Sequence, residues 1–310
     1  MNTQGFIKYA ESKGHSNKYL TKNIRFVKRF FERIKKEDLQ ITKPDILKYL
    51  EYLKNERKLQ NKSRSVHLIA INHYFTFLCK EGKIDKNPCL LLKIRGIKRK
   101  QLYNLYTSEE LDQLFDNYHH VFVRDFGNNS DQETTLCKER NALILSIFVY
   151  QGIKMEEMNK IEISDIDYKK ATLKIQNRRR GNERILPLKA TQIGLLMNYL
   201  QNIRPQLVEY QTKESNKLFL AKIQNKQKPS NQEGIISAFN YLIQQIKTID
   251  RQFINFKQVR ASVITNWLKT EDLRKTQYLA GHRYVSSTER YLPNNLDDLI
   301  EDINKLHPLL

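Results

Sequence analysis

The sequence contains little cysteine and no long apolar run. Its three cysteines, Cys79, Cys89 and Cys137, have the spacing of neither a metal site nor a redox motif. An odd and sparse set argues against a disulfide framework and favours a reducing compartment, so we expect a cytoplasmic protein. No apolar run approaches the length that spans a bilayer, and the first residues lack the apolar segment of a secretory signal.

Acidic residues are scarce in the first third of the chain. Residues 1–100 hold 25 Lys and Arg against 9 Asp and Glu, so the remainder holds 54 − 25 = 29 basic and 34 − 9 = 25 acidic residues. The net charges of the two parts are therefore +16 and +4, which sum to the +20 of the whole chain. This asymmetry favours a polyanionic partner, either nucleic acid or an anionic membrane surface. Well-solvated faces would explain an excess of lysine but not its concentration in one segment.

The chain is long enough for two domains, and the first, residues 1–92, is predicted to be helical. With 310 residues and 40% hydrophobic composition, the chain can build proper cores. Apolar side chains recur at helical spacing, and the run from Thr42 to Asp45 has the features of a helix start with proline in its first turn. Lys62 and Arg64 precede another such helix and are candidates for phosphate contacts, although a solvated surface explains them nearly as well.

Residues 93–106 are predicted to be a basic linker between the domains. Lys98, Arg99 and Lys100 lie in this stretch without helical periodicity. A short basic segment that joins two domains closing around a duplex would clamp the DNA backbone. Raising the salt concentration would then weaken binding steeply.

Residues 107–310 are predicted to form a second domain of mixed structure. A capping box begins at Thr107, and an apolar helix ends at Gly152. Period-two alternation in ATLKIQ and ERILPL, separated by NRRRGN, predicts a β-hairpin with a basic turn. We expect helices near 190–202 and 233–247, a short LFLA strand between them, and a loop at 124–138. The predicted fold class is therefore mainly α with a small β-sheet.

One arginine is out of place in the predicted helix of residues 256–268. At about 100° per residue, Arg260 falls inside the apolar sector of this helix. Burying a guanidinium is costly unless it meets an anion. The alternatives are a buried salt bridge to Asp or Glu and a phosphate bound through two parallel hydrogen bonds. Lys257, one turn earlier, lies at the edge of the same sector.

Residues 278–291 combine a glycine, a histidine and a tyrosine. Gly281 is predicted to end one helix, and His282 lies in the turn that follows. Residues 286–289 fit a capping box, which would place Tyr291 in the second turn of the next helix. A single His or Tyr is more often structural than catalytic. The combination of both, downstream of a misplaced arginine, is far less generic.

This segment resembles the Leu-Gly-His … Thr-x-x-Tyr signature of the tyrosine recombinases, also called phage-type integrases. Upstream, YQGIKMEEMNKIEISDID is similar to the family's Thr-Gly-Leu-Arg-x-x-Glu-Leu segment. RRRGNERILPL is similar to its basic turn before Arg-x-x-Pro-Leu, and FKQVRASV to its His-x-x-Arg segment. The first domain is similar to the core-binding, SAM-like domain of Xer-type members. The resemblance covers nearly the whole chain and follows the family's order.

The resemblance implies a tyrosine hydroxyl that attacks a DNA phosphodiester, leaving a 3′-phosphotyrosyl link and a free 5′-hydroxyl. That hydroxyl attacks the partner strand, so neither ATP, a metal nor another cofactor is needed. Tyr291 matches the nucleophile, Arg260 the second phosphate-clamping arginine, and His282 the histidine that hydrogen-bonds the scissile phosphate. Three positions differ from the commonest pattern. They are Lys154 at the first arginine, Arg179 nearest the β-turn lysine, and Lys257 at the first histidine.

These departures keep positive charge but change the geometry of the donors. One interpretation is an active recombinase in which Lys154 and Lys257 share the missing roles. The other is a DNA-binding accessory protein with weak or no cleavage. The retention of Tyr291, His282 and Arg260 favours the first, and the departures favour a mobile-element recombinase over a housekeeping Xer protein. A basic helical protein for RNA or membranes would explain the charge but not the order of these residues.

The last part of the chain is predicted to be an amphipathic helix, residues 294–306. Leucines and isoleucines recur at helical spacing, with acidic residues opposite. Packing on the chain's own core would explain this pattern. In the family such a helix often docks on a neighbouring subunit, which implies a homotetramer assembled on double-stranded DNA with a specific recombination site, and no membrane partner.

Overall fold

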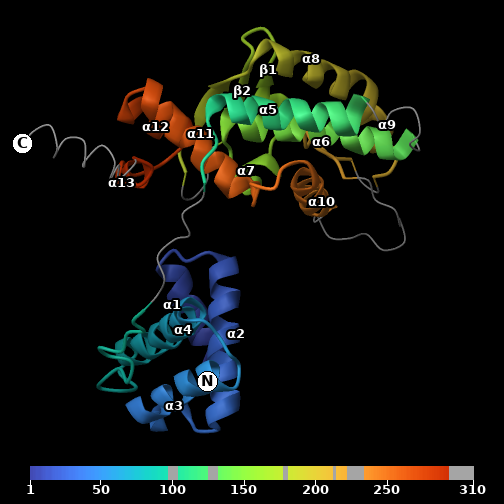
Figure 1. Ribbon diagram of the computed structural model, residues 1–310. Coiled ribbons are helices and arrows are strands. Elements are labelled where there is room, and N and C mark those ends of the chain that lie inside the picture. The colour runs from blue at the N-terminus through green and yellow to red at the C-terminus, as the bar shows by residue number, and fades with distance from the viewer. Residues whose placement is uncertain (97–103, 125–131, 177–180, 212–213, 222–233, 293–310) are drawn as a thin grey trace, which may run out of the picture. The chain divides into compact units, whose positions relative to one another are not determined.

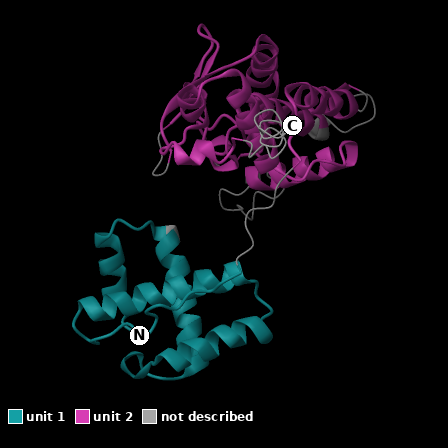
Figure 2. Cartoon of the chain, turned by 60° about the vertical axis from the view of Figure 1, so that its left-hand side comes forward, with its two compact units in different colours: residues 1–102 teal, residues 103–310 magenta. Residues whose placement is uncertain are grey.

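The structure, a computed structural model, describes residues 1–96, 104–124, 132–176, 181–211, 214–221 and 234–292 (Figure 1). The chain divides into two compact units, residues 1–102 and 103–310 (Figure 2). The described residues are mainly helical with a small sheet, which confirms the predicted fold class. Within these ranges, no helix combines the length and apolar character needed to cross a bilayer.

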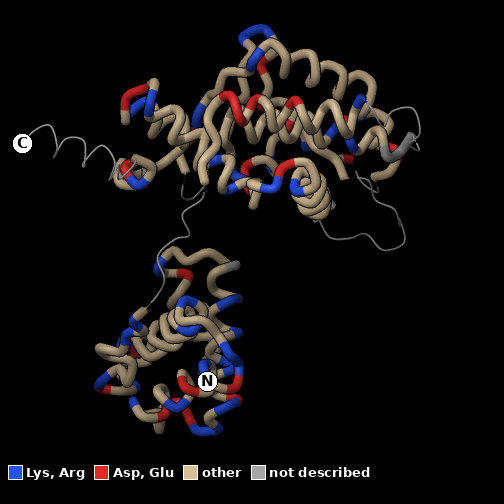
Figure 3. The backbone as a smooth tube through the Cα atoms, in the orientation of Figure 1, with Lys and Arg blue, Asp and Glu red and all other residues tan. Residues whose placement is uncertain are grey.

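Unit 1 is a helical bundle. Its elements are α1 (Thr3–Ser12), α2 (Asn17–Ile34), the 3-10 helix η1 (Asp38–Gln40), α3 (Lys43–Asn55) and α4 (Asn61–Lys80). The predicted helix start at α3 is confirmed. The Thr42 N–H donates to the Asp45 carboxylate at 2.9 Å, and proline lies in the first turn. Lys and Arg residues are spread along the helices and loops of this unit (Figure 3).

The core of unit 1 is rich in aromatic rings. Phe30 of α2 packs edge-on against Tyr49 of α3, with 5.2 Å between ring centroids, and against Phe75 of α4 at 6.4 Å. All three rings are fully buried. Burial of one such side chain contributes about 1.5–3 kcal/mol, so these contacts hold α2, α3 and α4 together.

Unit 2 is built around the buried helix α6. The elements before its sheet are α5 (Ser108–His119), the π-helix η2 (His120–Arg124), α6 (Gln132–Gln151), α7 (Met155–Met158) and the 3-10 helix η3 (Ile163–Asp165). Those after the sheet are α8 (Ala190–Asn198), the π-helix η4 (Tyr199–Ile203), α9 (Arg204–Val208), α10 (Gly234–Ile249), α11 (Phe256–Thr270), α12 (Leu273–Ala280) and α13 (Ser286–Glu289). The apolar stretch of α6 packs against α5, α8 and α11, and Gly152 follows it with a φ of 52°, as the sequence predicted.

The sheet has three antiparallel strands in the order β1-β2-β3. They are β1 (Ile166–Asp167), β2 (Thr172–Ile175) and β3 (Arg184–Pro187). The predicted hairpin pairs Leu173 with Leu186 and Ile175 with Arg184. Because alternate side chains point to opposite faces, Arg184 shares the buried face with Leu186, whereas Ile185 is exposed.

Three local predictions were wrong. Residues 124–138 were predicted to be a loop, but α6 already begins at Gln132, with Leu136 buried as an apolar anchor. LFLA, residues 218–221, forms none of the named strands of the described chain, although Leu218 is buried. Residues 286–289 do not form the predicted capping box, since α13 is a single turn preceded by a residue with helical backbone angles. Tyr291 therefore lies after α13 and not in its second turn.

Candidate active site

Arg260 is buried on α11, where it binds the ends of two other helices. Its guanidinium donates to the carbonyl of Gly152, just after α6, and to the carbonyl of Ala280, the last residue of α12, at 2.6 Å. Helix C-termini carry unpaired carbonyls and a partial negative charge, which suits a cation. Of the alternatives left by the sequence, a direct salt bridge is not present, because no described carboxylate lies within ion-pair distance of Arg260.

His282 lies beside Arg260 and is held in one tautomer. Its Nε2 lies 3.2 Å from the Arg260 guanidinium, and a guanidinium only donates hydrogen bonds. Nε2 therefore accepts, and Nδ1 carries the proton that it donates to the Thr288 hydroxyl at 3.0 Å. Burial, together with the charges of Arg260 and Lys154, lowers the pKa of His282 to about 4. The imidazole is therefore neutral at physiological pH.

Tyr291 is brought to the same point by the turn after α13. Its ring stacks on His282 with 5.8 Å between centroids and 15° between planes. Burial lowers the pKa of Arg260, whereas the charges of Glu157 and Tyr291 raise it. Tyr291 thus lies beside a histidine that contacts the Arg260 guanidinium, which two backbone carbonyls hold in place.

Lys154 and Glu157 lie at the start of α7. The Lys154 N–H donates to the Glu157 carboxylate at 2.9 Å, and its Nζ lies 4.0 Å from the other carboxylate oxygen. Burial lowers the pKa of Lys154, as do the charges of Arg260 and Arg184, while Glu157 opposes them. Lys154 is thus a half-buried amine beside the arginine and histidine of the site.

The sequence prediction missed Arg184 and Glu157 as site residues. The Arg184 guanidinium binds Glu157 through two hydrogen bonds of 3.1 and 2.9 Å, and its side chain has no exposed surface. Burial raises the pKa of Glu157, but the hydrogen bonds and charge of Arg184 lower it more, so the group is ionised. The sequence did contain a signal for Arg184, because this cation lies on the inward face of a strand whose side chains alternate between inside and outside. Arg260 likewise lies on the inward face of a helix.

Gly281 joins the histidine to the sheet. Its φ is 62°, and a Cβ at this position would collide with the Arg184 guanidinium. Residues with a Cβ adopt this left-handed region at a cost of about 1–2 kcal/mol. Next to it, His282 forms an isolated antiparallel bridge with Gly181. The described end of the β2–β3 connection therefore lies beside His282.

The other predicted site residues are placed as follows. Lys257 is exposed in the first turn of α11, one turn before Arg260. In unit 1, Lys62 is exposed in the first turn of α4, and Arg64 is half-buried and donates to the Asn61 side chain at 3.1 Å. Four predicted residues, Lys98, Arg99, Lys100 and Arg179, and the predicted helix 294–306 lie outside the described residues.

The structure brings together Lys154, Arg260, His282 and Tyr291, with the Arg184–Glu157 ion pair behind them. Two cations, a neutral imidazole and a phenol hydroxyl form a site with a net positive charge. Such a set can bind an anion and stabilise negative charge that develops on it. In the part of the chain that is described, no cluster of three His, Cys, Asp or Glu residues is placed to hold a metal ion.

A family model described as "Phage integrase family" matches residues 107–297. The chain is 26% identical over 309 residues to a tyrosine recombinase XerC from Oceanobacillus iheyensis, covering 98% of this chain and 94% of that protein. It is 29% identical over 273 residues to a tyrosine recombinase XerC from Natranaerobius thermophilus, covering 87% of this chain and 84% of that protein.

Two solved structures share the fold. The Tn1549 transposon integrase in complex with circular intermediate DNA has a TM-score of 0.63 at 13% identity, covering 97% of this chain and 98% of that one. The XerH recombinase bound to a palindromic difH substrate, a post-cleavage complex, has a TM-score of 0.61 at 18% identity, covering 92% of this chain and 76% of that one.

Proposed function

Because the chain belongs to the phage integrase family, we propose that it is a site-specific DNA recombinase that cuts and rejoins DNA through a 3′-phosphotyrosyl intermediate. The observation that carries this proposal is the position of Tyr291. Its ring stacks on His282, and the Nε2 atom of that histidine lies 3.2 Å from the buried guanidinium of Arg260. A phosphate bound by this arginine would lie next to the nucleophile.

In the proposed cleavage step, the Tyr291 oxygen forms a bond to phosphorus and the bond from phosphorus to the 5′-oxygen breaks. The tyrosine proton is released to water, and the leaving oxygen takes up a proton from the enzyme. Arg260 stabilises the charge of the pentavalent phosphate, since its donors are already oriented before DNA binds. His282 has a neutral ring whose orientation is fixed by Thr288, and it positions both the arginine and the tyrosine.

We assign the proton donor to Lys154. Arginine does not release its proton at neutral pH, which rules out Arg260 and Arg184. His282 is neutral, and its remaining proton is donated to Thr288. Lys154 is a protonated amine whose lowered pKa makes it a better acid than an ordinary lysine.

The partner and setting follow from the same proposal. The substrate is double-stranded DNA with a specific recombination site. The acidic amphipathic segment 294–306 links protomers into a tetramer on that DNA. The departures at Lys154, Arg179 and Lys257 favour a recombinase of a mobile element over a housekeeping Xer protein, and its free cysteines suit a reducing cytoplasm.

A second candidate function is a DNA-binding accessory protein of the same fold. The observation that favours it is Lys154, because a lysine provides a point charge where an arginine would offer two parallel donors to phosphate. This candidate predicts DNA binding with no covalent intermediate.

A nicked suicide substrate that carries the cognate site separates the two functions. Repeats that flank the native gene are the place to look for that site. We expect a covalent protein–DNA adduct that resists denaturation and that Tyr291→Phe abolishes. Tyr284→Phe is the matched control, since Tyr284 is exposed in the segment between α12 and α13. The absence of any adduct with a site that the protein binds specifically would leave only the accessory function.

The role of Lys154 has its own test. Lys154→Ala should slow cleavage of an ordinary phosphodiester by about 10²–10⁴-fold. A substrate with sulfur as the 5′-bridging atom needs no proton donor, because a thiolate is a good leaving group, so it should restore most of the rate. Arg260→Ala should not be restored by sulfur. If sulfur fails to restore Lys154→Ala, Lys154 is not the acid.

A further inference from the structure

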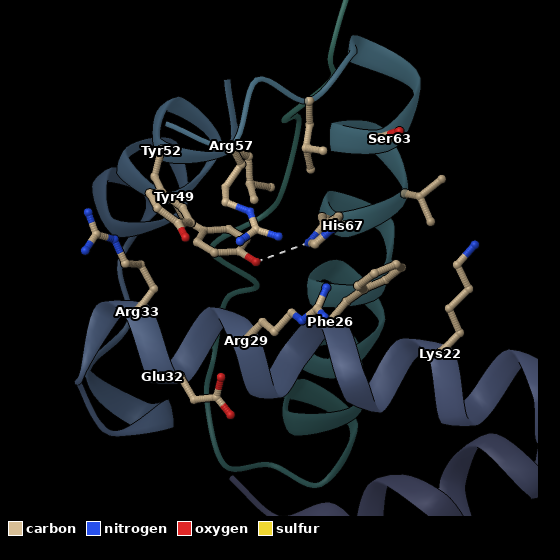
Figure 4. A pocket seen from close by; sticks show the side chains of 13 residues that line it. Lys22, Phe26, Arg29, Glu32, Arg33, Tyr49, Tyr52, Arg57, Ser63 and His67 are labelled. Carbon is tan, nitrogen blue, oxygen red and sulfur yellow. Dashed lines mark hydrogen bonds between the residues drawn. The ribbon is translucent and has the colours of Figure 1, made fainter. Parts of the chain in front are cut away.

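Unit 1 contains an open cavity of about 570 Å³ that no part of the proposed chemistry uses (Figure 4). It lies between α2, the end of α3 and the start of α4. Its basic and acidic lining residues are Lys22, Arg29, Glu32, Arg33 and Arg57. Four cations therefore face one carboxylate around a single opening.

The floor of the cavity is aromatic and uncharged. Phe26 packs against His67 with 4.0 Å between ring centroids and 30° between ring planes, and the Tyr49 hydroxyl lies 3.1 Å from His67 Nδ1. All three residues are buried. Burial lowers the pKa of His67 to about 4, and the charges of the arginines at the rim lower it in the same direction. The histidine is neutral at physiological pH, so the positive charge of the cavity comes from its rim.

Arg33 differs from the other cations of the rim. It forms an ion pair with Glu56 at 2.9 Å, and its guanidinium lies 4.4 Å from the centre of the Tyr52 ring. Its donors are therefore partly occupied by the protein itself.

Arg29 and Arg57 have no such partner. Among the described residues, neither makes an ion pair or a side-chain hydrogen bond. Both side chains line the cavity, and their charges act on Tyr49 and on His67. Figure 4 shows Arg29 reaching from α2 and Arg57 reaching from the segment after α3 toward the Tyr49–His67 hydrogen bond. Glu32 is the one carboxylate among the lining residues, so the rim keeps an excess of positive charge. Like charges repel each other, and a bound anion would lower that repulsion.

We propose that this cavity is a phosphate site, in which Arg29 and Arg57 bind the phosphate oxygens. A guanidinium offers a planar fork of donors that fits two phosphate oxygens, and two forks, one from α2 and one from the segment after α3, can enclose a tetrahedral anion. The neutral aromatic floor adds an apolar surface for whatever group carries the phosphate, and the volume is within the range of small-ligand pockets. The phosphate comes either from the DNA backbone or from a free nucleotide. A phosphate that belongs to DNA rests on the proposed function, whereas the binding of a phosphate by Arg29 and Arg57 does not.

The test compares two double variants that remove the same charge. Arg29→Gln/Arg57→Gln removes the cavity cations, and Lys28→Gln/Lys54→Gln removes two exposed cations of α2 and α3 that do not line the cavity. Binding of inorganic phosphate and of ATP is measured by calorimetry, and binding of duplex DNA by anisotropy at several salt concentrations. Circular dichroism shows that each variant is folded.

We expect both phosphate probes to bind the wild-type and lysine-control proteins at least tenfold more tightly than the arginine variant. If the source is DNA, the arginine variant also loses at least tenfold in DNA affinity relative to the control, and the slope of log K against log salt decreases by about 1. If the source is a free nucleotide, ATP binding is lost but DNA affinity equals that of the control. The proposal is overturned if the two double variants bind every probe equally well. Because no step of this test needs a covalent adduct, its failure is distinct from failure of the recombinase function.

Discussion

Each unit places one histidine among arginines, buried in unit 1 and half-buried in unit 2, and the two histidines have the same altered pKa. Loss of solvation is the largest cause for both His67 in unit 1 and His282 in unit 2, and nearby arginine charges act in the same direction, so that each pKa is about 4. Each ring also packs against an aromatic neighbour, Phe26 at 30° between ring planes in one case and Tyr291 at 15° in the other. The chemistry at the centre of the two regions is therefore alike.

The arginines around the two histidines differ. Arg260 and Arg184 are buried, and backbone carbonyls or a carboxylate hold their guanidinium groups. Arg29 and Arg57 are exposed at the rim of an open cavity. Cations with fixed donors stabilise a transition state, because no reorganisation is needed when charge develops. Exposed cations contribute mainly to affinity, with strong dependence on salt. Under the two proposals, a neutral histidine therefore accompanies catalysis in unit 2 and phosphate binding in unit 1.

The largest expected effect is a loss of stability when the Arg184–Glu157 ion pair of unit 2 is broken. Glu157→Gln leaves Arg184 fully buried without a counter-charge, which should lower the free energy of unfolding by about 3–5 kcal/mol. Urea unfolding followed by the fluorescence of Trp267, the one tryptophan of the chain, measures this in unit 2. Glu183→Gln is the matched control. The Glu183 carboxylate lies 3.0 Å from the Lys174 amine, and both side chains are about half exposed. Such exposed ion pairs contribute about 0.2–1 kcal/mol to stability. Equal losses in the two variants would contradict the distinction between buried and exposed cations.

The next effect is on catalysis. Arg260→Ala should lower the rate of adduct formation at saturating DNA by roughly 10²–10³-fold, because a fixed donor to the transition state is lost. Arg260→Lys should recover little, since lysine keeps the charge but not the two parallel donors. Single-turnover cleavage measures both rates. Arg57→Ala is the comparison from unit 1, and it should weaken the binding of inorganic phosphate while the rate of adduct formation at saturating DNA stays unchanged. If Arg260→Ala changed affinity and left the rate at saturation intact, the assignment of catalysis to unit 2 would be wrong.

Acidification should destabilise unit 1 through His67. Its pKa is about 4 in the folded chain and 6.5 ordinarily, so between these values only the unfolded chain takes up a proton. Above pH 6.5 His67 is neutral in both states, so the stability of unit 1 is not reduced. The free energy of unfolding falls by up to roughly 3 kcal/mol as the pH drops to 4. His67→Gln should flatten this dependence in urea unfolding followed by circular dichroism.

The two units can be distinguished in the same experiment. The fluorescence of Trp267 reports unit 2, where His282 should produce a loss in the same direction and over the same pH window. His67→Gln should leave that fluorescence transition unchanged at every pH. A change in the fluorescence transition would show that the two histidines do not titrate independently.

A smaller effect is expected at Thr288, which fixes the tautomer of His282. Thr288→Val removes the acceptor of the Nδ1 proton, and an unpaired buried polar group costs about 1–3 kcal/mol. The cleavage rate should fall by about tenfold, because the ring that stacks on Tyr291 is no longer held. Thr288→Ser keeps the hydroxyl and should restore the rate. Loss of stability with an unaltered rate would reduce Thr288 to a purely structural residue.

Much of unit 2 was predictable because its buried cations break an apolar pattern. Arg260 interrupts a helical stripe, and the same argument with a period of two would have identified Arg184 in β3. The predicted capping box at residues 286–289 failed for a physical reason: Ser286 is already the first helical residue of α13, and Val285 before it has helical backbone angles, so the serine does not cap the helix. The early start of α6 was hidden by a polar segment with few apolar anchors.

The cavity of unit 1 left no comparable signal in the sequence. Arg29 and Arg57 are exposed residues of different segments, and each taken alone matches the pattern of a solvated face. Only the packing of α2 against α3 and α4 brings them to one opening. Sequence patterns therefore detect cations that are buried within one element more readily than cations that meet across elements.

The smallest effect should come from the one ion pair at the rim of that cavity. Arg33 and Glu56 have side chains that are 48% and 60% exposed, so Glu56→Ala should change the free energy of unfolding by less than about 1 kcal/mol. The same change frees Arg33 and removes a negative charge near the opening, so phosphate should bind more tightly, by roughly two- to fivefold. Calorimetry with inorganic phosphate measures the affinity, and urea unfolding measures the stability. In unit 2 the loss of an acid, Glu157, should destabilise the fold, whereas in unit 1 the loss of an acid should improve binding. Weaker phosphate binding by Glu56→Ala would mean that the rim of unit 1 also depends on oriented cations, and the contrast between the units would be lost.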